Sequence, residues 1–364
     1  MKEAMSSLRI VEIDPSTDLR WERFLTTQPN ALIYQHPAWI QTIEESYGYT
    51  PVYLACEDTS GELCGVLPLC SKHSVLGGNI FSSLPYTPVS GPLAVDEQIA
   101  TMLVASSIAR AQEEYGAMLE LRTLSPALDV DMIGAPASPT YMLALPEQPD
   151  LLRFGTSQNH AGIKRSVNKA MKSSVFVRAA ETEHDLWAWY KLYAATMLDL
   201  AALPRPYRFF QVAWKRMSPR GMLRLLLAEH VEAGTRRLLG GIVLLLCGQT
   251  VYYAYGGWNR DQQALRPNDA LHWRAIHDAI SEGFRWYDFG QTALSNEGLT
   301  HYKRKWGAQA TMVFTYHYPA ASRAGTGMQL RDANSRSRKI ALAILRRLPI
   351  KAVDLLSNWL RSSY

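Results

Sequence analysis

One order of predicted secondary structure runs twice along the 364 residues and constrains the fold more than any single motif. It consists of a strand, helices, a meander of strands, a further helix and a closing strand, identified from the period of 2 or 3.6 at which apolar residues recur. A chain of this length suits two domains better than one. Because 47% of the residues are hydrophobic, there is enough apolar material for two cores. The sequence therefore predicts two α/β units in tandem.

The first predicted unit covers residues 1–150. Pro37 at a first helical turn and Gly48 just after a helix are typical of helix ends. The expected helices are 18–25, 37–47 and 96–115, and the expected strands are 9–13, 51–57, 63–71 and 118–122.

The second predicted unit covers residues 151–322, and residues 323–364 are expected to form a linker and a basic amphipathic C-terminal helix. Gly248 and Gln249 are expected to make a tight turn between two strands. The expected helices are 164–172, 183–198, 207–217 and 268–282, and the expected strands are 175–179, 222–229, 238–247, 250–255, 286–289 and, closing the unit, 311–318.

Hydropathy and charge restrict the location and the partners. The most apolar segment, residues 238–247, is too short to span a bilayer and indicates a buried strand. The N-terminus is polar and has no apolar run of signal-peptide length, so we expect a cytoplasmic protein. The net charge of +5 is concentrated at residues 164–172, near Arg304 and after Arg323, which favours an anionic substrate or membrane surface.

Several motifs occur in a characteristic order: residues 34–39 (YQHPAW), 83–86 (SLPY) with 91–92 (GP), 119–122 (LELR), 266–269 (RPND), 283–290 (GFRWYDFG) and 302–307 (YKRKWG). With this order and spacing, the chain from about residue 33 to 349 resembles the FemABX superfamily, especially its proteins associated with bacterial exopolysaccharide and cell-envelope clusters. The resemblance implies an α/β fold with two tandem GNAT-like (acyl-CoA N-acyltransferase-type) lobes, each with a mixed β-sheet, followed by the C-terminal amphipathic helical tail.

The resemblance also implies an acyltransferase or aminoacyltransferase. The best-known members of the family transfer amino acids from aminoacyl-tRNA to peptidoglycan precursors. The long coiled-coil arm that some tRNA-using members insert in the second lobe is not visible in this sequence. We expect no tightly bound cofactor, and the expected donor is either aminoacyl-tRNA or an acyl-CoA.

The expected donor site precedes the predicted helix at residues 268–282. GNAT enzymes bind the donor's pyrophosphate with main-chain amides at a helix N-terminus, and Arg266 and Asn268 occupy the matching position. However, the segment lacks glycines, and the carboxylate of Asp269 would repel a phosphate. The alternative is that Asn268 or Asp269 only caps the helix.

Lys303 and Asp288 are the expected catalytic residues. The resemblance places Lys303 at the family's aromatic-Lys motif, where a cation binds an anionic acceptor or stabilises an oxyanion. Asp288 ends a predicted strand between two aromatic residues, where a carboxylate can orient the attacking amine or act as a base. The alternatives are that Asp288 caps a turn and that Lys303 lies on a strand whose lysines face water.

The expected substrate-binding residues are spread over both lobes. Lys164, Arg165, Lys169 and Lys172 recur at spacings that place several of them on one face of a basic helix. The alternative for this helix is a solvated face. The full expected set consists of Lys164, Arg165, Arg205, Lys305, Trp39, Tyr86 and Gln291. The histidines lack a pair at helical ligand spacing with a carboxylate nearby, so no metal site is expected.

Three functional hypotheses follow. The first is direct acyl or aminoacyl transfer to an amine or hydroxyl of an anionic cell-envelope or polysaccharide precursor, with tRNA as a potential donor partner. The second is a CoA-dependent N- or O-acetyltransferase of polysaccharide. The third is a non-catalytic GNAT-like binding or scaffold protein, which predicts that Lys303 and Asp288 lie on a solvated surface. In each case the basic C-terminal helix either contacts the inner face of the cytoplasmic membrane or packs on the protein.

Overall fold

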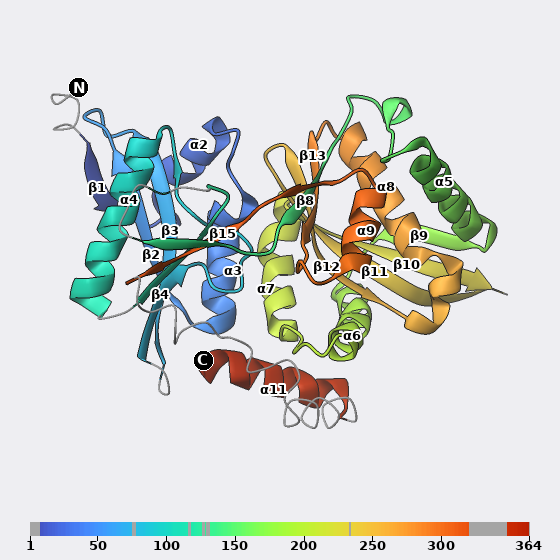
Figure 1. Cartoon of the computed structure of the whole chain (residues 1–364). Helices are drawn as coiled ribbons and strands as arrows, with labels where there is room; N and C mark the ends of the chain where they lie inside the picture. Colours follow the sequence, from blue (N-terminus) through green and yellow to red (C-terminus); the bar gives the residue numbers. More distant parts are fainter. Residues whose placement is uncertain are drawn as a thin grey trace. The chain divides into compact units, whose positions relative to one another are not determined.

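The computed structural model describes residues 8–74, 78–115, 118–125, 128, 132–232, 234–319 and 348–363. The chain forms two compact units, each with its own sheet (Figure 1). The first unit contains Met1–Ser138 and a return segment that begins at Met312. The second contains Pro139–Thr311 and most of the C-terminal helix. The two sheets confirm the predicted α/β fold with mixed sheets.

The first sheet has the strand order β1-β2-β3-β4-β6-β15-β7, with β5 paired to β3. It is mixed because β4 and β6 are parallel and the other pairs are antiparallel. Its strands are β1 (Arg9–Glu12), β2 (Thr50–Glu57), β3 (Leu63–Ser74), β4 (Gly78–Ser83), β5 (Leu93–Ala94), β6 (Met118–Thr123), β7 (Ile133–Pro136) and β15 (Phe314–Tyr318). Its helices are α2 (Arg20–Thr27), α3 (Pro37–Tyr47) and α4 (Glu97–Arg110), which continues into a π-helical turn at Ala111–Tyr115.

The core of the first unit lies between α4 and the sheet. Asp96 caps α4 by accepting a hydrogen bond from the amide of Ile99 at 2.8 Å. Ile99, Leu103 and Val104 then pack against apolar residues of β2, β3, β4 and β6. Burial of these side chains is the main favourable contribution to folding of this unit.

The second sheet has the order β14-β8-β13-β12-β11-β10-β9, in which β12 and β13 are parallel. Its strands are β8 (Thr140–Ala144), β9 (Val175–Ala179), β10 (Leu223–Glu232), β11 (Thr235–Cys247), β12 (Thr250–Trp258), β13 (Trp286–Gln291) and β14 (Gln309–Thr311). Its helices are α5 (Ser157–Lys172), α6 (Glu183–Asp199), α7 (Tyr207–Met217), α8 (Pro267–Ser281), α9 (Glu297–Lys305) and α11 (Ile350–Ser363). Short 3₁₀ turns lie at Ile33–Gln35, Pro149–Leu151, Ser218–Arg220 and Arg260–Leu265.

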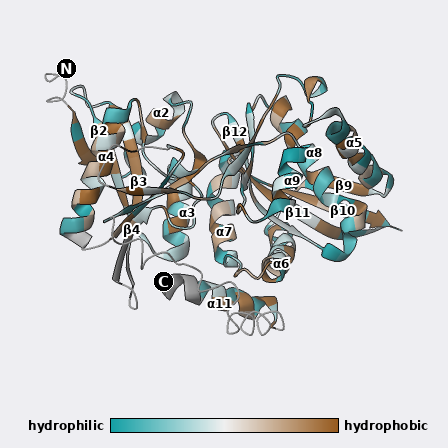
Figure 2. Cartoon of the chain, in the orientation of Figure 1, coloured by the Kyte–Doolittle hydropathy of each residue, from teal (hydrophilic) through white to brown (hydrophobic). Residues whose placement is uncertain are grey.

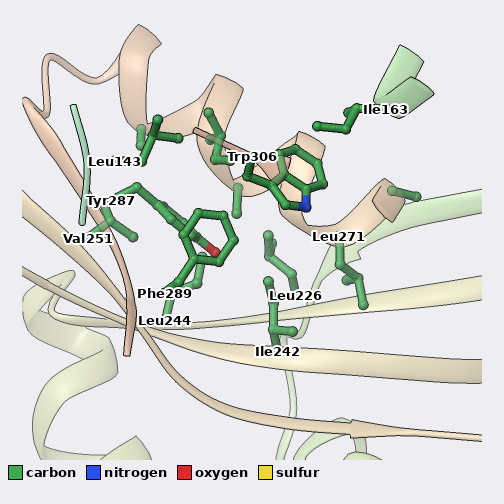
Figure 3. Packing of buried hydrophobic residues seen from close by; sticks show 14 of the residues in the cluster. Leu143, Ile163, Leu226, Ile242, Leu244, Val251, Leu271, Tyr287, Phe289 and Trp306 are labelled. Carbon is green, nitrogen blue, oxygen red and sulfur yellow. The ribbon is translucent and has the colours of Figure 1, made fainter. Parts of the chain in front are cut away.

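The larger core fills the space between the second sheet and helices α5, α8 and α9 (Figure 3). Trp306 and Phe289 are fully or almost fully buried there with Leu271, and Ile242 and Leu244 contribute from β11. Phe154 meets the Trp306 ring edge-on at 4.8 Å. Figure 2 shows α5 and α9 as largely hydrophilic helices.

On the other face of the second sheet, α6 lies directly on two glycines. A Cβ at Gly257 would lie 2.4 Å from the backbone nitrogen of Tyr193, and one at Gly241 would lie 2.8 Å from the Trp189 ring. Trp189 also donates a hydrogen bond from Nε1 to the carbonyl of Gly241 at 2.9 Å. The absence of side chains at these glycines therefore sets the distance between α6 and the sheet.

The strand expected to close the second unit belongs to the first sheet. Residues 314–318 form β15, which pairs with β6 and β7, and Tyr316 is buried in the core of the first unit. Conversely, β8, which lies within the expected first unit of residues 1–150, pairs with β13 and β14 of the second sheet. The second sheet thus begins earlier in the sequence than predicted, at β8. The first sheet takes its strand β15 from the part of the chain that follows the second unit. A local apolar pattern does not specify such distant partners, because it fixes only which face of a strand is buried.

The predicted C-terminal helix is present as α11, from Ile350 to Ser363. Residues 323–347 of the expected tail, including the expected linker, lie outside the described residues. The buried Val353 packs with Leu198, and Leu203 and Leu356 pack around them. In the described part of the chain, no helix is both long enough and apolar enough to cross a membrane.

Replacing Gly257 by alanine should destabilise the protein by about 1–3 kcal/mol, because the new Cβ overlaps the α6 backbone and α6 must move away from the sheet. Urea unfolding measures this change in the free energy of unfolding. Gly298→Ala is the matched control, since a Cβ there has its nearest neighbour at 4.0 Å. Equal stability of the two variants would contradict the close packing of α6.

Candidate functional site

The candidate site lies where two parallel strands of the second unit separate. Strands β12 and β13 pair only from Thr250 opposite Trp286 to Tyr252 opposite Asp288. Beyond that point β12 continues to Trp258 beside β11, and their pairing is interrupted by a bulge between Tyr253 and Tyr255. The edge of β12 that faces β13 is therefore unpaired with it from Tyr253 onward.

Gly290 ends the regular part of β13. Its φ of 76° lies in the left-handed region, which glycine adopts without a Cβ penalty. Asp288 Oδ1 accepts a hydrogen bond from the Gly290 amide at 2.7 Å and another from Thr140 Oγ1 at 2.5 Å. The carboxylate thus stabilises the turn in β13 at the point where the register between β8 and β13 shifts.

Lys303 holds the same turn from α9. Its Nζ donates hydrogen bonds to the carbonyl oxygens of Gly290 at 2.8 Å and Gln291 at 3.1 Å. The ammonium also lies 5.4 Å from the centre of the Tyr141 ring. Lys303 is 1% exposed, and it is a helical residue rather than part of a strand facing water. The structure thus brings both predicted catalytic residues to one glycine, and the alternative of solvated lysines does not hold for Lys303.

Burial shifts the pKa values of both groups towards their neutral forms. Desolvation lowers the pKa of Lys303 to about 8, against an opposing effect of the Asp288 charge. Desolvation likewise raises the pKa of Asp288, while its two hydrogen bonds and Lys303 act in the opposite direction. Lys303 is consequently an amine that changes charge near neutral pH.

A neutral histidine, His272, contacts the strand β13 that carries Asp288. His272 Nδ1 lies 2.9 Å from the hydroxyl of Tyr287, and its ring packs against Phe289 and Trp306. Desolvation, with a smaller effect of Lys303, lowers the pKa of His272 to about 3. The imidazole therefore remains uncharged at neutral pH.

Arg205 is held on the α7 side of β12. Its guanidinium lies 4.8 Å from the centre of the Phe209 ring and 5.3 Å from that of Tyr255. Tyr255 belongs to the part of β12 beyond its pairing with β13. The structure thus places Arg205 against the strand that borders the candidate site.

The start of α8, the expected donor site, has a mixed electrostatic character. Arg266 is exposed, with φ of 61°, and precedes the helix without a side-chain cap. Asp269 is buried in the first turn, and Oδ1 of both Asp269 and Asn268 lacks a hydrogen-bond partner. Desolvation raises the pKa of Asp269, whereas Lys305 and Arg266 oppose this shift.

The basic helix α5 is longer than expected and begins two turns earlier, capped by Thr156. Lys164, Arg165, Lys169 and Lys172 are all exposed. Lys305 approaches this helix, since its Cε lies 3.9 Å from the position that a Cβ on Gly162 would occupy. The helix contains no acidic residue, so these four exposed charges have no acidic partner within the helix.

Trp39 and Tyr86 belong to the first unit. Trp39 is buried in α3 and donates from Nε1 to Thr87 Oγ1 at 3.0 Å. Tyr86 has φ of 58° and packs beside Tyr47. Their part in a site shared with the second unit stays a prediction.

The sequence did not single out three residues that complete the site. Gly290 carries the turn, Thr140 holds Asp288, and His272 supports Tyr287. A glycine directly after a strand was a usable signal for the turn. Nothing local indicated Thr140, because β8 is separated from β13 by more than a hundred residues.

The comparisons with known proteins agree with this geometry. Residues 157–304 match the family described as "Acetyltransferase (GNAT) domain". The matched segment covers less than half of the chain and lies within the second unit. The matched residues include α8, β13 and Lys303, and thus the separated strands of the candidate site.

Solved structures have a similar fold over most of the chain. The crystal structure of FemX is 16% identical, with a TM-score of 0.65 over 84% of this chain and 96% of that one. A C-terminal domain of a putative lysylphosphatidylglycerol synthetase from Agrobacterium fabrum is 12% identical, with a TM-score of 0.55 over 85% and 94% of the two chains. A tandem GNAT protein from the clavulanic acid pathway is 10% identical, with a TM-score of 0.50 over 85% and 98%. No curated protein matches the sequence significantly.

No group of three or more His, Cys, Asp or Glu side chains suited to a metal ion occurs in the described ranges.

Acid should destabilise the protein through His272. The unfolded chain binds a proton at this residue near the ordinary histidine pKa of about 6.5, whereas the folded chain does so only at about pH 3. Stability therefore falls with decreasing pH across this window, by about 1.4 kcal/mol per pH unit from this group. Urea unfolding of wild type and His272→Gln between pH 7 and pH 4 should show a shallower pH dependence for the variant. His301→Gln, at an exposed histidine, is the control and should match wild type.

Proposed function

We propose that the second unit is an acyltransferase or aminoacyltransferase that transfers an acyl group directly to an amine or hydroxyl of an anionic cell-envelope or polysaccharide precursor. The observation that carries this proposal is the buried Lys303, held with Asp288 on Gly290 where β12 and β13 separate. The GNAT fold supports the reaction class, and the FemX-like tandem supports the extension to aminoacyl transfer.

Asp288 is suited to orient the nucleophile. Both of its hydrogen bonds end on Oδ1, so Oδ2 is available to accept a hydrogen bond from the attacking amine or hydroxyl. Its raised pKa gives the carboxylate a higher proton affinity than an exposed aspartate. In the proposed step, the nucleophile forms a bond to the donor's carbonyl carbon, its proton passes to Asp288, and the donor's leaving group departs from the tetrahedral intermediate.

Lys303 is suited to stabilise the negative charge of that intermediate. Two of its three N–H donors are used on carbonyl oxygens, which fixes the ammonium in position. The third donor and the positive charge remain for the oxyanion. A cation that is already fixed in a dry environment needs little reorganisation during the reaction.

The positive residues of the unit are suited to hold an anionic acceptor. Arg205 borders the strand β12, and Lys305 lies near Gly162 of α5, the helix that carries the exposed Lys164 and Arg165. Gln291 lies beside the Lys303 turn. We propose that these residues bind the phosphate or carboxylate groups of the precursor.

The donor is aminoacyl-tRNA or an acyl-CoA. The start of α8 fits the pyrophosphate of CoA poorly, because the buried Asp269 has an unpaired carboxylate oxygen in the first helical turn. This favours the tRNA donor over the CoA-dependent acetyltransferase. Arg266 and Asn268 remain the proposed contacts to the donor in either case.

The alternative of a non-catalytic scaffold predicts Lys303 and Asp288 on a solvated surface. Their burial, 1% and 8% exposed, favours the enzyme. We place the enzyme in the cytoplasm, where either donor is made.

A thermal-shift titration distinguishes these alternatives. Acetyl-CoA, aminoacyl-tRNA and a nucleotide-linked muropeptide are each added to wild type, Lys303→Ala and the control Arg304→Ala. A ligand present at a hundred times its Kd stabilises the folded protein by about 2.7 kcal/mol. We expect the muropeptide and one donor to raise the melting temperature of wild type and Arg304→Ala, and to do so less in Lys303→Ala. Absence of any shift would favour the scaffold.

Transfer should also depend on the charge of Lys303. With the donor and acceptor so identified, Lys303→Met should lower the transfer rate by about 100-fold, the typical loss for one oxyanion donor. The wild-type rate should decline as pH rises through about 8, where Lys303 loses its proton, and this decline should be absent in Lys303→Met. Arg304→Met removes an exposed charge from the same helix and should behave as wild type. An equal loss in both variants would rule out this role.

A further inference from the structure

The C-terminal helix α11 docks on the second unit through a carboxylate. Asp354 Oδ1 accepts a hydrogen bond from the Tyr207 amide at 2.6 Å and another from the Tyr190 hydroxyl at 3.0 Å. Tyr207 is the first residue of α7, and the preceding Pro206 supplies no side-chain cap. Asp354 therefore gives α7 the N-terminal cap that its own sequence lacks.

The same network holds the backbone of Arg205. The Tyr190 hydroxyl lies 3.1 Å from the Arg205 carbonyl, and the Arg205 amide donates to the Tyr193 hydroxyl at 3.2 Å. Burial and the charge of Asp354 raise the pKa of Tyr190, so its hydroxyl remains a donor. Asp354 thus contacts Tyr190, whose hydroxyl lies beside the Arg205 carbonyl, and Tyr207, which follows Arg205 by two residues.

The position of the Arg205 side chain follows from these contacts. Its guanidinium lies over the rings of Phe209, in the first turn of α7, and Tyr255, on β12. Contact with both rings fixes the guanidinium relative to the first turn of α7 and to β12. A shift of the first turn of α7 would move Phe209 and the Arg205 backbone together.

We propose that α11 is a positioning element of the anion site, in which docking of Asp354 holds Arg205 in the orientation that binds the acceptor's anionic group. This inference rests on the proposed function. Docking also buries the apolar side chain of Val353 against the protein. The docked helix therefore does not offer this residue to a membrane.

The test is isothermal titration with inorganic pyrophosphate, as a probe for a phosphate-bearing acceptor, together with hydrogen exchange of residues 207–212. Asp354→Ala and Arg205→Ala should each weaken pyrophosphate binding about tenfold, and the double variant should be no weaker than Arg205→Ala alone. Asp354→Ala should also speed exchange in the first turn of α7. Leu355→Ala, at a side chain of α11 that is 71% exposed, is the control and should match wild type in both measurements.

Asp354→Asn keeps an acceptor oxygen and should bind pyrophosphate more tightly than Asp354→Ala, which separates positioning from loss of folding. Faster exchange with unchanged affinity in Asp354→Ala would overturn the inference while leaving the anion site in place. Additive losses in the double variant would overturn it as well. Absence of pyrophosphate binding by the wild type would overturn the proposed anion site at Arg205, and the inference with it.

Discussion

The hydrogen bonds around Gly290 are the constraint on which the candidate site depends. Asp288 binds the amide of this glycine and Lys303 binds its carbonyl, so one strand end is held from both sides. Burying two opposite charges costs several kcal/mol for each ion unless their hydrogen bonds are satisfied. The cost is offset here by four hydrogen bonds, to Thr140, the Gly290 amide and two carbonyls.

The predictable and unpredictable parts of this fold differ in the range of the interactions involved. The apolar residues of β11 and the Gly248–Gln249 turn specify their structure locally, and both predictions are confirmed. The sequence did not indicate to which sheets β8 and β15 belong, because the partners of these strands lie far away in the sequence. The sequence also did not decide the local structure of residues 302–307, most of which belong to α9. Asn296, which caps α9 through the amide of Leu299, was the available signal for a helix there.

The proximity of Lys303 and Asp288 was predictable only through the family resemblance. Their burial was not, because a run of Lys and Arg normally lies in water. The contribution of α11 was equally hidden. Asp354 is an ordinary acidic residue in the sequence, and its partners Tyr190 and Tyr207 come from α6 and α7. Gly257 allows α6 to lie close to the sheet, so backbone packing in the core ultimately places the tyrosines that hold Arg205.

Comparison of the two sheets indicates which features belong to the fold and which to the chemistry. In the first sheet β4 and β6 are parallel and pair from Ile80 opposite Met118 to Ser82 opposite Glu120, as β12 and β13 do up to Asp288. Glu120 therefore occupies the position of Asp288, but it forms a partly exposed ion pair with Arg122 at 2.9 Å. A surface pair of this kind contributes little energy and leaves neither charge fixed in a dry environment. Both sheets thus contain a parallel strand pair, whereas the buried Lys303 and its hydrogen bonds to the glycine turn belong to the second unit.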